Sequence, residues 1–160
     1  MTTASPSPAL SIRNVQQSYD KRPVLDGIDL TVQAGESLAL VGINGAGKTT
    51  LIKGILNFIA LDAGDIQICN TPHTNDSSRR ALLYLPERFT PAPFFTGLAY
   101  ILHTAHLYGT SVSREKAEEM CRGLDLEPEA LTSSVGSYSK GMTQKLGLAA
   151  ALLVERHLLL

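Results

Sequence analysis

The sequence has no excess of charge of either sign. Its 160 residues include 14 lysines and arginines and 15 aspartates and glutamates, for a formal net charge of -1 at pH 7. A protein that neutralises many phosphates of DNA or RNA carries a clustered basic surface instead. The charge balance therefore disfavours nucleic acid as a partner, and we expect none.

Cysteines and long apolar runs are also scarce. The chain has 2 cysteines, Cys69 and Cys121, which are far apart and in no metal-ligand spacing, so they indicate reduced thiols of a cytoplasmic protein. The longest apolar run, LGLAAALLV at 146–154, is much shorter than the ~20 residues that a helix needs to cross a bilayer. We therefore expect no membrane crossing by this chain alone.

The patterns of strand and helix alternate in the first half of the chain. Apolar and alternating stretches predict strands at 10–19, 24–33, 36–43, 64–69 and 81–86, and a helix over 48–58. That helix has an apolar face that would cover a sheet of mostly parallel strands, formed by Leu51, Ile52, Ile55, Leu56 and Ile59. Helical patterns at 97–109 and 113–126 then predict a helical insertion. The fold class is α/β.

The strongest chemical motif is GINGAGKTT at 42–50, between the predicted strand 36–43 and the predicted helix. It satisfies G-x-x-x-x-G-K-[ST] in the context that this phosphate-binding motif requires. Its glycines allow successive backbone N–H groups to surround a phosphate, Lys48 can reach the β- and γ-phosphates, and the Thr49 hydroxyl can ligate Mg²⁺. The candidate nucleotide-binding residues are Gly42, Asn44, Gly45, Ala46, Gly47, Lys48, Thr49 and Thr50. By itself the loop leaves GTPases, nucleotide kinases and transport ATPases open.

A second motif separates these classes. SYSKGMTQKLGLAAALL at 137–153 resembles the signature segment of ABC-type ATPases, with YSKGM in the place of the commoner LSGGQ. In that family the Ser and Gly of the signature lie at a helix N-terminus and bind the γ-phosphate held by the opposite subunit, roles that the resemblance assigns to Ser139 and Gly141. The signature residues are Ser139, Lys140, Gly141 and Met142. A Ser-capped amphipathic helix without a ligand is the alternative.

Two further residues match the family pattern. Tyr19 matches the aromatic residue that stacks on adenine in ABC proteins, and Glu87, in LLYLPERFTP, stands where the family usually has a Gln that senses Mg²⁺ and the membrane partner. Because Mg²⁺ prefers hard oxygen donors, Glu87 joins Thr49 as a candidate metal ligand, whereas a surface carboxylate is its alternative role. YLPER together with YSKGM is most similar to the ATPase subunits of ABC-2 exporters.

The resemblance runs from Leu10 onward and implies a domain organisation. It implies a lead over residues 1–9, which we expect to be disordered, and an ABC ATPase-like nucleotide-binding domain over 10–160 with a helical subdomain at about 90–145. The implied fold is a P-loop NTPase core with a mostly parallel sheet, N-terminal antiparallel strands and a helical insertion. In the family a hydrophobic strand and an acidic pair follow the signature helix. HLLL at 157–160 matches the start of that strand, so we expect a C-terminally incomplete domain whose catalytic acidic pair lies beyond Leu160.

The resemblance also implies a function. It implies a nucleotide-binding subunit that binds ATP and Mg²⁺, pairs with a second such subunit as a homodimer or heterodimer, and powers export through a separate membrane subunit at the inner face of the cell membrane. One alternative is a truncated nucleotide-binding fragment without hydrolytic activity. Another, a non-transport ABC-type ATPase acting on ribosomes or DNA, is disfavoured by the lack of a basic surface and of a second P-loop. Whether the chain hydrolyses ATP stays open.

Overall fold

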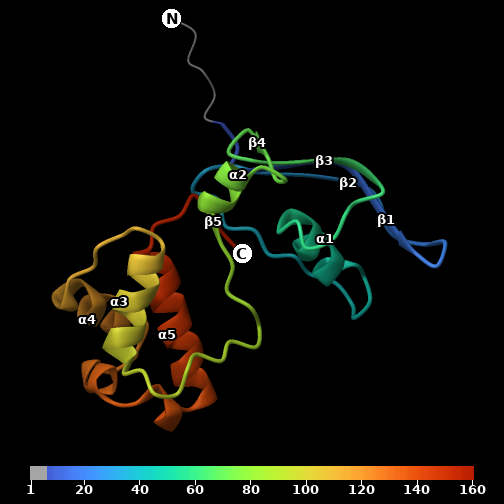
Figure 1. Ribbon diagram of the computed structural model, residues 1–160. Helices are drawn as coiled ribbons and strands as arrows, with labels where there is room; N and C mark the ends of the chain where they lie inside the picture. Colours follow the sequence, from blue (N-terminus) through green and yellow to red (C-terminus); the bar gives the residue numbers. More distant parts are fainter. Residues whose placement is uncertain (1–6) are drawn as a thin grey trace, which may run out of the picture. The chain divides into compact units, whose positions relative to one another are not determined.

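The computed structural model describes residues 7–160, which form two compact units (Figure 1). The first unit ends at Leu82 and the second runs from Leu83 to Leu160. Most of the expected lead, residues 1–6, lies outside the described residues. Its last residues contact the first unit, because Asn70 Nδ2 donates a hydrogen bond to Ser7 Oγ (2.7 Å) and the Cys69 N–H donates to the Ala9 carbonyl (3.1 Å).

The first unit is built on a four-stranded sheet with the order β2-β1-β3-β4. Its strands are β1 (Leu10–Tyr19), β2 (Arg22–Val32), β3 (Ala63–Ile68) and β4 (Thr71–Pro72), and every neighbouring pair is antiparallel. The hairpin between β1 and β2 turns at Asp20 and Lys21, whose φ angles of 49° and 62° are those that a tight two-residue hairpin requires. The patterns at 10–19, 24–33 and 64–69 are thus confirmed as strands.

Two short helices accompany this sheet. Helix α1 (Lys48–Ile55) buries Leu51 and Ile55, in agreement with the predicted apolar face. A Cβ atom at Gly54 would lie 3.0 Å from Leu61 Cδ2, so this glycine allows α1 to approach Leu61, just before β3, closely. The helix ends before the predicted residue 58, because Asn57 adopts a left-handed φ of 55°.

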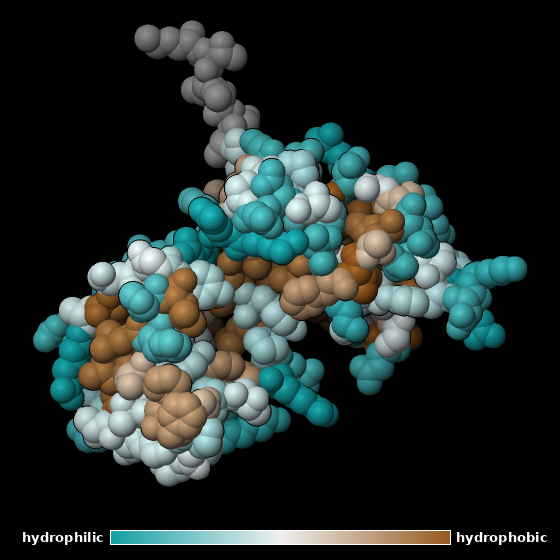
Figure 2. Space-filling view, in the orientation of Figure 1, coloured by the Kyte–Doolittle hydropathy of each residue, from teal (hydrophilic) through white to brown (hydrophobic). Residues whose placement is uncertain are grey.

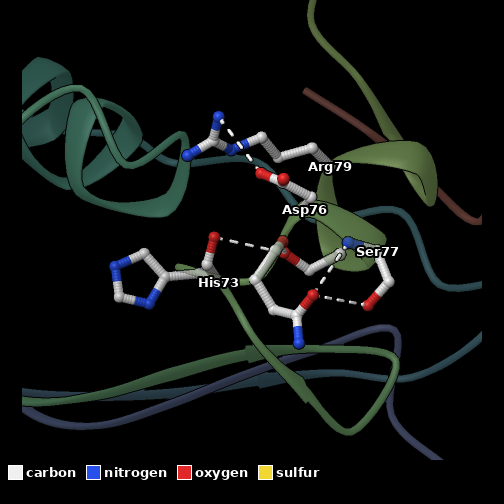
Figure 3. Close-up of polar contacts among 6 residues, drawn as sticks. His73, Asp76, Ser77 and Arg79 are labelled. Carbon is white, nitrogen blue, oxygen red and sulfur yellow. Dashed lines mark hydrogen bonds and ion pairs between the residues drawn. The ribbon is translucent and has the colours of Figure 1, made fainter.

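Helix α2 (Asp76–Arg80) begins with a side-chain cap, shown in Figure 3. The Asn75 side chain accepts a hydrogen bond from the Ser77 N–H at 3.0 Å, and Asp76 and Arg79 form an exposed ion pair at 3.7 Å. The buried Ser78 hydroxyl donates to the His73 carbonyl at 3.1 Å. These contacts satisfy the first turn locally, as the preference for Asn at the N-cap predicts.

The expected N-terminal antiparallel strands are confirmed, because they form this four-stranded sheet. Two other expectations, a strand at 36–43 and a mostly parallel sheet, were wrong within residues 7–160. The stretch 36–43 forms no strand, and the four-stranded sheet contains no parallel pair. A continuous apolar strand is stable where neighbouring strands satisfy its backbone and both of its faces are covered. The described residues provide neither, since Leu38 is 44% exposed, Val41 88% and Ile43 82%.

The second unit is mainly helical. It contains α3 (Gly97–Leu107), α4 (Arg114–Gly123) and α5 (Lys140–Leu153), with two short 3-10 helices, η1 (Pro128–Thr132) and η2 (Val135–Ser137), before α5. The predictions of helices at 97–109 and 113–126 are confirmed. Their buried faces meet in one core, formed by Ile101, Ala117, Cys121, Leu126, Leu131, Val135, Leu146, Ala149, Ala150 and Leu153. Other apolar residues of this unit remain at its surface, beside hydrophilic ones (Figure 2).

Strands β5 (Leu82–Leu83) and β6 (Leu158–Leu159) form a separate two-stranded sheet. The Leu160 N–H donates to the Leu83 carbonyl (3.0 Å) and the Leu85 N–H donates to the Leu160 carbonyl (2.8 Å). The two partners of Leu160, Leu83 and Leu85, lie on either side of one residue, which is the hydrogen-bond pattern of parallel strands. None of the helices described here is long and apolar enough to span a membrane.

Candidate functional site

The glycine loop at 42–47 leads directly into α1, and its last glycine is fitted against β2. Gly45 and Gly47 have φ angles of 85° and 88°, a region that residues with a side chain rarely adopt. A Cβ atom at Gly47 would lie 2.8 Å from the Val24 carbonyl oxygen and 3.0 Å from Leu25 Cδ2. Only glycine therefore allows both this conformation and this approach to β2.

The start of α1 offers free hydrogen-bond donors. Gly47 occupies the N-cap, no side chain caps the helix, and its first turn contains no acidic residue. The first N–H to bond back along the helix is that of Leu51, which donates to the Gly47 carbonyl at 2.8 Å. The earlier N–H groups and the positive end of the helix dipole fit an anion, and Thr49 and most of the loop are exposed to solvent.

The Lys48 side chain folds over the glycine loop. Its Nζ atom donates hydrogen bonds to the Gly42 carbonyl at 2.6 Å and the Ile43 carbonyl at 2.8 Å. Both acceptors are neutral, whereas a phosphate oxygen is charged and makes a stronger bond to an ammonium group. The lysine is therefore held beside the loop, and a phosphate bound there would compete for it.

The predicted metal ligands belong to different units. Thr49 is exposed at the start of α1, and its hydroxyl fits Mg²⁺, which keeps several waters and usually takes one or two protein ligands together with phosphate oxygens. Glu87 belongs to the second unit. Across residues 7–160, no three His, Cys, Asp or Glu side chains group as a metal site, so a Mg²⁺ ion would depend on the nucleotide for its remaining ligands.

Tyr19 ends β1 at the same end of the hairpin that contacts the glycine loop. Its side chain is 46% exposed, and it pairs with Arg22 of β2. Leu25 of β2, which would contact a side chain at Gly47, pairs with Gln17 of β1. Since a strand rises about 3.3 Å per residue, Tyr19 lies roughly 7 Å along β1 from the level of that contact. An exposed aromatic ring at this place is compatible with stacking on the base of a bound nucleotide.

The signature residues form the start of α5. Ser139 is the N-cap, and its hydroxyl accepts a hydrogen bond from the Met142 N–H at 3.2 Å. Lys140 and Gly141 are exposed, and a Cβ atom at Gly141 would meet nothing closer than Ser139 Oγ at 3.9 Å. The arrangement is both an ordinary helix cap and an accessible helix N-terminus, so each reading of the motif fits it.

Tyr138 has a structural role that the motif comparison missed. Its hydroxyl donates a hydrogen bond to the Ala130 carbonyl at 2.5 Å, and it lies so close to Gly97 that a side chain there would collide with it. Burial raises the pKa of this phenol. In the sequence, this role was indicated only by an aromatic residue at the position where the family usually has leucine. The residues that Tyr138 contacts lie outside the motif, so the motif could not predict them.

Glu87 is exposed in an irregular segment at 84–92, which we call the Glu87 loop. The Glu87 carbonyl accepts a hydrogen bond from Gln144 Nε2 at 2.9 Å. A pocket of about 410 Å³ lies between this loop, residues 135–138 and the first turns of α5, with Glu87 and Lys140 among its lining residues. Neither Gln144 nor its contact was predicted from the sequence.

The glycine loop and the uncapped helix that it opens are the features of the class of P-loop proteins. A family model described as ABC transporter matches residues 25–160, and the chain belongs to that family. The resemblance found in the sequence is thereby confirmed.

Two relatives that match this chain are ATP-binding proteins of transporters. The Nod factor export ATP-binding protein I of Burkholderia thailandensis is 34% identical over 89% of this chain and 48% of its own length. The aliphatic sulfonates import ATP-binding protein SsuB of Corynebacterium glutamicum is 32% identical over 99% of this chain and 61% of its own length. The chain thus spans about half the length of the first of these curated relatives.

A solved structure confirms the ABC ATPase fold. A putative ABC transporter ATP-binding protein from Pyrococcus furiosus superposes with a TM-score of 0.84 at 29% identity, over 94% of this chain and 72% of that one. The superposed region includes both the antiparallel sheet and the helices described above, since it covers nearly the whole chain.

Proposed function

We propose that this chain binds ATP with Mg²⁺ as part of the nucleotide-binding subunit of an ABC transporter. The observation that carries the proposal is the glycine loop, where Lys48 Nζ lies on two loop carbonyls at 2.6 and 2.8 Å beside an uncapped helix N-terminus. Such an arrangement can bind a phosphate through backbone N–H groups and exchange the lysine bonds for bonds to the anion. Thr49 supplies one oxygen to Mg²⁺, and Tyr19 stacks on the base.

Membership of the family supports the proposed partners. A second nucleotide-binding subunit, identical or homologous, contributes its signature residues to the phosphate held by this chain, and Ser139 and Gly141 do the same in return. A membrane subunit holds the pair at the cytoplasmic face of the membrane. We assign residues 10–160 to this nucleotide-binding domain, with the helical subdomain at about 90–145.

We assign the direction of transport as export. The support is the similarity of YLPER and YSKGM to exporter subunits, together with relatives named for Nod factor export. Import is the second candidate, favoured by the relative named for import of aliphatic sulfonates. Reconstitution of the complex in vesicles, with labelled cargo on one side, distinguishes the two.

Substitution of Lys48 tests the proposed nucleotide site. Lys48→Ala should weaken ATP binding at least about tenfold, because a hydrogen bond to a charged group contributes roughly 1.5 to 3 kcal/mol. Titration with a fluorescent ATP analogue measures the affinity.

Lys53→Ala is the matched control, since Lys53 is an exposed lysine of the same helix outside the loop. It should leave the affinity within about twofold. Equal affinities of the wild-type chain and Lys48→Ala would exclude the loop as the nucleotide site.

A further inference from the structure

The Glu87 loop is attached to α5 by two contacts that lie one turn apart on the helix. The first is the hydrogen bond from Gln144 Nε2 to the Glu87 carbonyl, 2.9 Å long and made by residues 57 positions apart in the chain. The second involves Gly147, where a Cβ atom would lie 2.9 Å from both Leu85 Cδ1 and Phe89 Cδ1. Residues three apart on a helix share a face, so one face of α5 holds the loop.

We propose that Gln144 is a positioning residue, which holds Glu87 in place through its backbone carbonyl. An irregular loop has few backbone bonds of its own, so a single side-chain donor can decide its conformation. Gln144 supplies that donor from inside a helix. The absence of a side chain at Gly147 lets the rings and methyl groups of the loop pack directly on the helix backbone.

The same helix begins with the signature residues. Ser139 caps α5 and Gln144 lies little more than one turn farther along, so the start of the helix and the Glu87 loop form one connected body within the second unit. The effect of Gln144 on a bound metal, unlike its effect on the loop, rests on the proposed function. If Glu87 approaches the metal of a bound nucleotide, then Gln144 sets where that carboxylate stands relative to the signature.

Three substitutions at two neighbouring positions separate this role from a general effect on folding. Gln144→Glu has the same size but its carboxylate cannot donate to a carbonyl, and Gln144→Lys restores a donor. Lys145→Met is the matched control, because Lys145 Nζ donates to the Asp125 carbonyl at 2.8 Å and so holds a different loop from the adjacent residue of α5.

Amide hydrogen exchange, followed by mass spectrometry of peptides covering 84–92 and 124–127, provides the measurement. Gln144→Glu should speed exchange of 84–92 about fivefold, the effect of losing one net hydrogen bond on a local opening, and leave 124–127 unchanged. Lys145→Met should do the reverse, and Gln144→Lys should restore the wild-type rate at 84–92. Wild-type exchange of 84–92 in Gln144→Glu, or an equal rise there in Lys145→Met, would overturn the proposal.

ATP titrations with Mg²⁺ and with EDTA examine the consequence for the site. Gln144→Glu should reduce the gain in affinity that Mg²⁺ provides while leaving the affinity in EDTA unchanged. If Gln144→Glu loosens the loop but Mg²⁺ still raises the ATP affinity as much as in the wild type, the link between Gln144 and the metal is overturned. If the wild-type chain binds no ATP at all, the proposed function is overturned instead. The exchange experiment needs no nucleotide, so it tests the positioning of the loop independently.

Discussion

One residue of the glycine loop, Gly47, is required to be glycine for two separate reasons. Gly47 needs a left-handed backbone to open α1, and it also needs the space that a side chain would fill at β2. Gly35 shows the first demand alone, since its φ is 78° and nothing lies within 4 Å of a Cβ atom placed there. Substitutions at Gly35 and Gly47 therefore separate the free-energy cost of a left-handed backbone from the cost of a steric overlap with β2.

Alanine substitution at these two glycines should have unequal effects. Gly35→Ala should cost about 1 kcal/mol of unfolding free energy, the penalty of a left-handed alanine. Gly47→Ala should cost about 1 to 3 kcal/mol more, because the new methyl group overlaps the Val24 carbonyl, and it should also weaken ATP binding. Urea titrations followed by circular dichroism provide the free energies. Equal costs at the two positions would mean that β2 yields to the methyl group.

Helix α5 is the element in which stability and proposed function overlap most. Its N-cap residue, Ser139, is also the candidate phosphate ligand, and the buried face of the helix, with Leu146 and Leu153, belongs to the core of the second unit. Ser113 caps α4 in the same way, accepting a hydrogen bond from the Lys116 N–H at 3.2 Å, but lies outside any predicted site. The two serines allow a residue that only caps a helix to be compared with one for which a second role is proposed.

Ser139→Ala and Ser113→Ala should each cost about 1 kcal/mol of unfolding free energy, the usual effect of losing an N-cap. Ser139→Asp should retain the stability, because aspartate caps a helix as well as serine does and also interacts favourably with the dipole. It should nevertheless abolish ATP-dependent dimerisation, measured by sedimentation velocity, since its charge repels a phosphate. Dimerisation of Ser139→Asp equal to that of the wild type would leave Ser139 with a capping role alone.

The molecule as a whole consists of two units with separate cores. The sheet buries Ile12 to 1% exposure, whereas the helices bury Ile101 and Cys121 completely. A chain with two compact units need not unfold in a single cooperative step. A method that resolves position along the chain shows whether the two units unfold together.

Large-to-small substitutions in the two cores should act locally. Ile101→Ala should lower the protection of amides in α3, α4 and α5 by the equivalent of about 2 to 5 kcal/mol, the range for such a cavity, and leave β1 to β3 unchanged. Ile12→Ala should do the reverse. Amide hydrogen exchange measured on both variants provides the comparison. A loss of protection throughout the chain in either variant would show that the two units unfold as one.

Alkaline pH should destabilise the helical unit, in which burial raises the pKa of Tyr100 as well as the pKa values of Cys121 and Tyr138. Burial raises the pKa of the Cys121 thiol above its ordinary value of 9.0 and that of the Tyr138 phenol above 10.0. Because the fold favours the protonated forms, their contribution to stability is complete below pH 9 and is lost as the pH rises through the folded pKa values. The urea midpoint should therefore fall from about pH 9 upward. Cys121→Ala should remove the thiol's part of this fall, and an unchanged profile would assign the loss to other groups.

The sequence by itself was sufficient for features that depend on neighbouring residues. The glycine loop, the strand β1 and the helices α3 and α4 were all predicted, because turn chemistry and hydrophobic period act over a few residues. The family followed from two motifs and is confirmed by the match over residues 25–160. The roles of Tyr19, Glu87 and the signature residues remain predictions.

Only the tertiary structure decided which surfaces meet. The stretch 36–43 has the composition of a buried strand, but within residues 7–160 no neighbour supplies its hydrogen bonds, and its apolar side chains stay exposed. The contacts of Tyr138 with Ala130 and of Gln144 with Glu87 likewise join segments that no local pattern connects. Periodicity determines which face of an element is apolar, whereas the partner of that face depends on contacts between residues far apart in the chain.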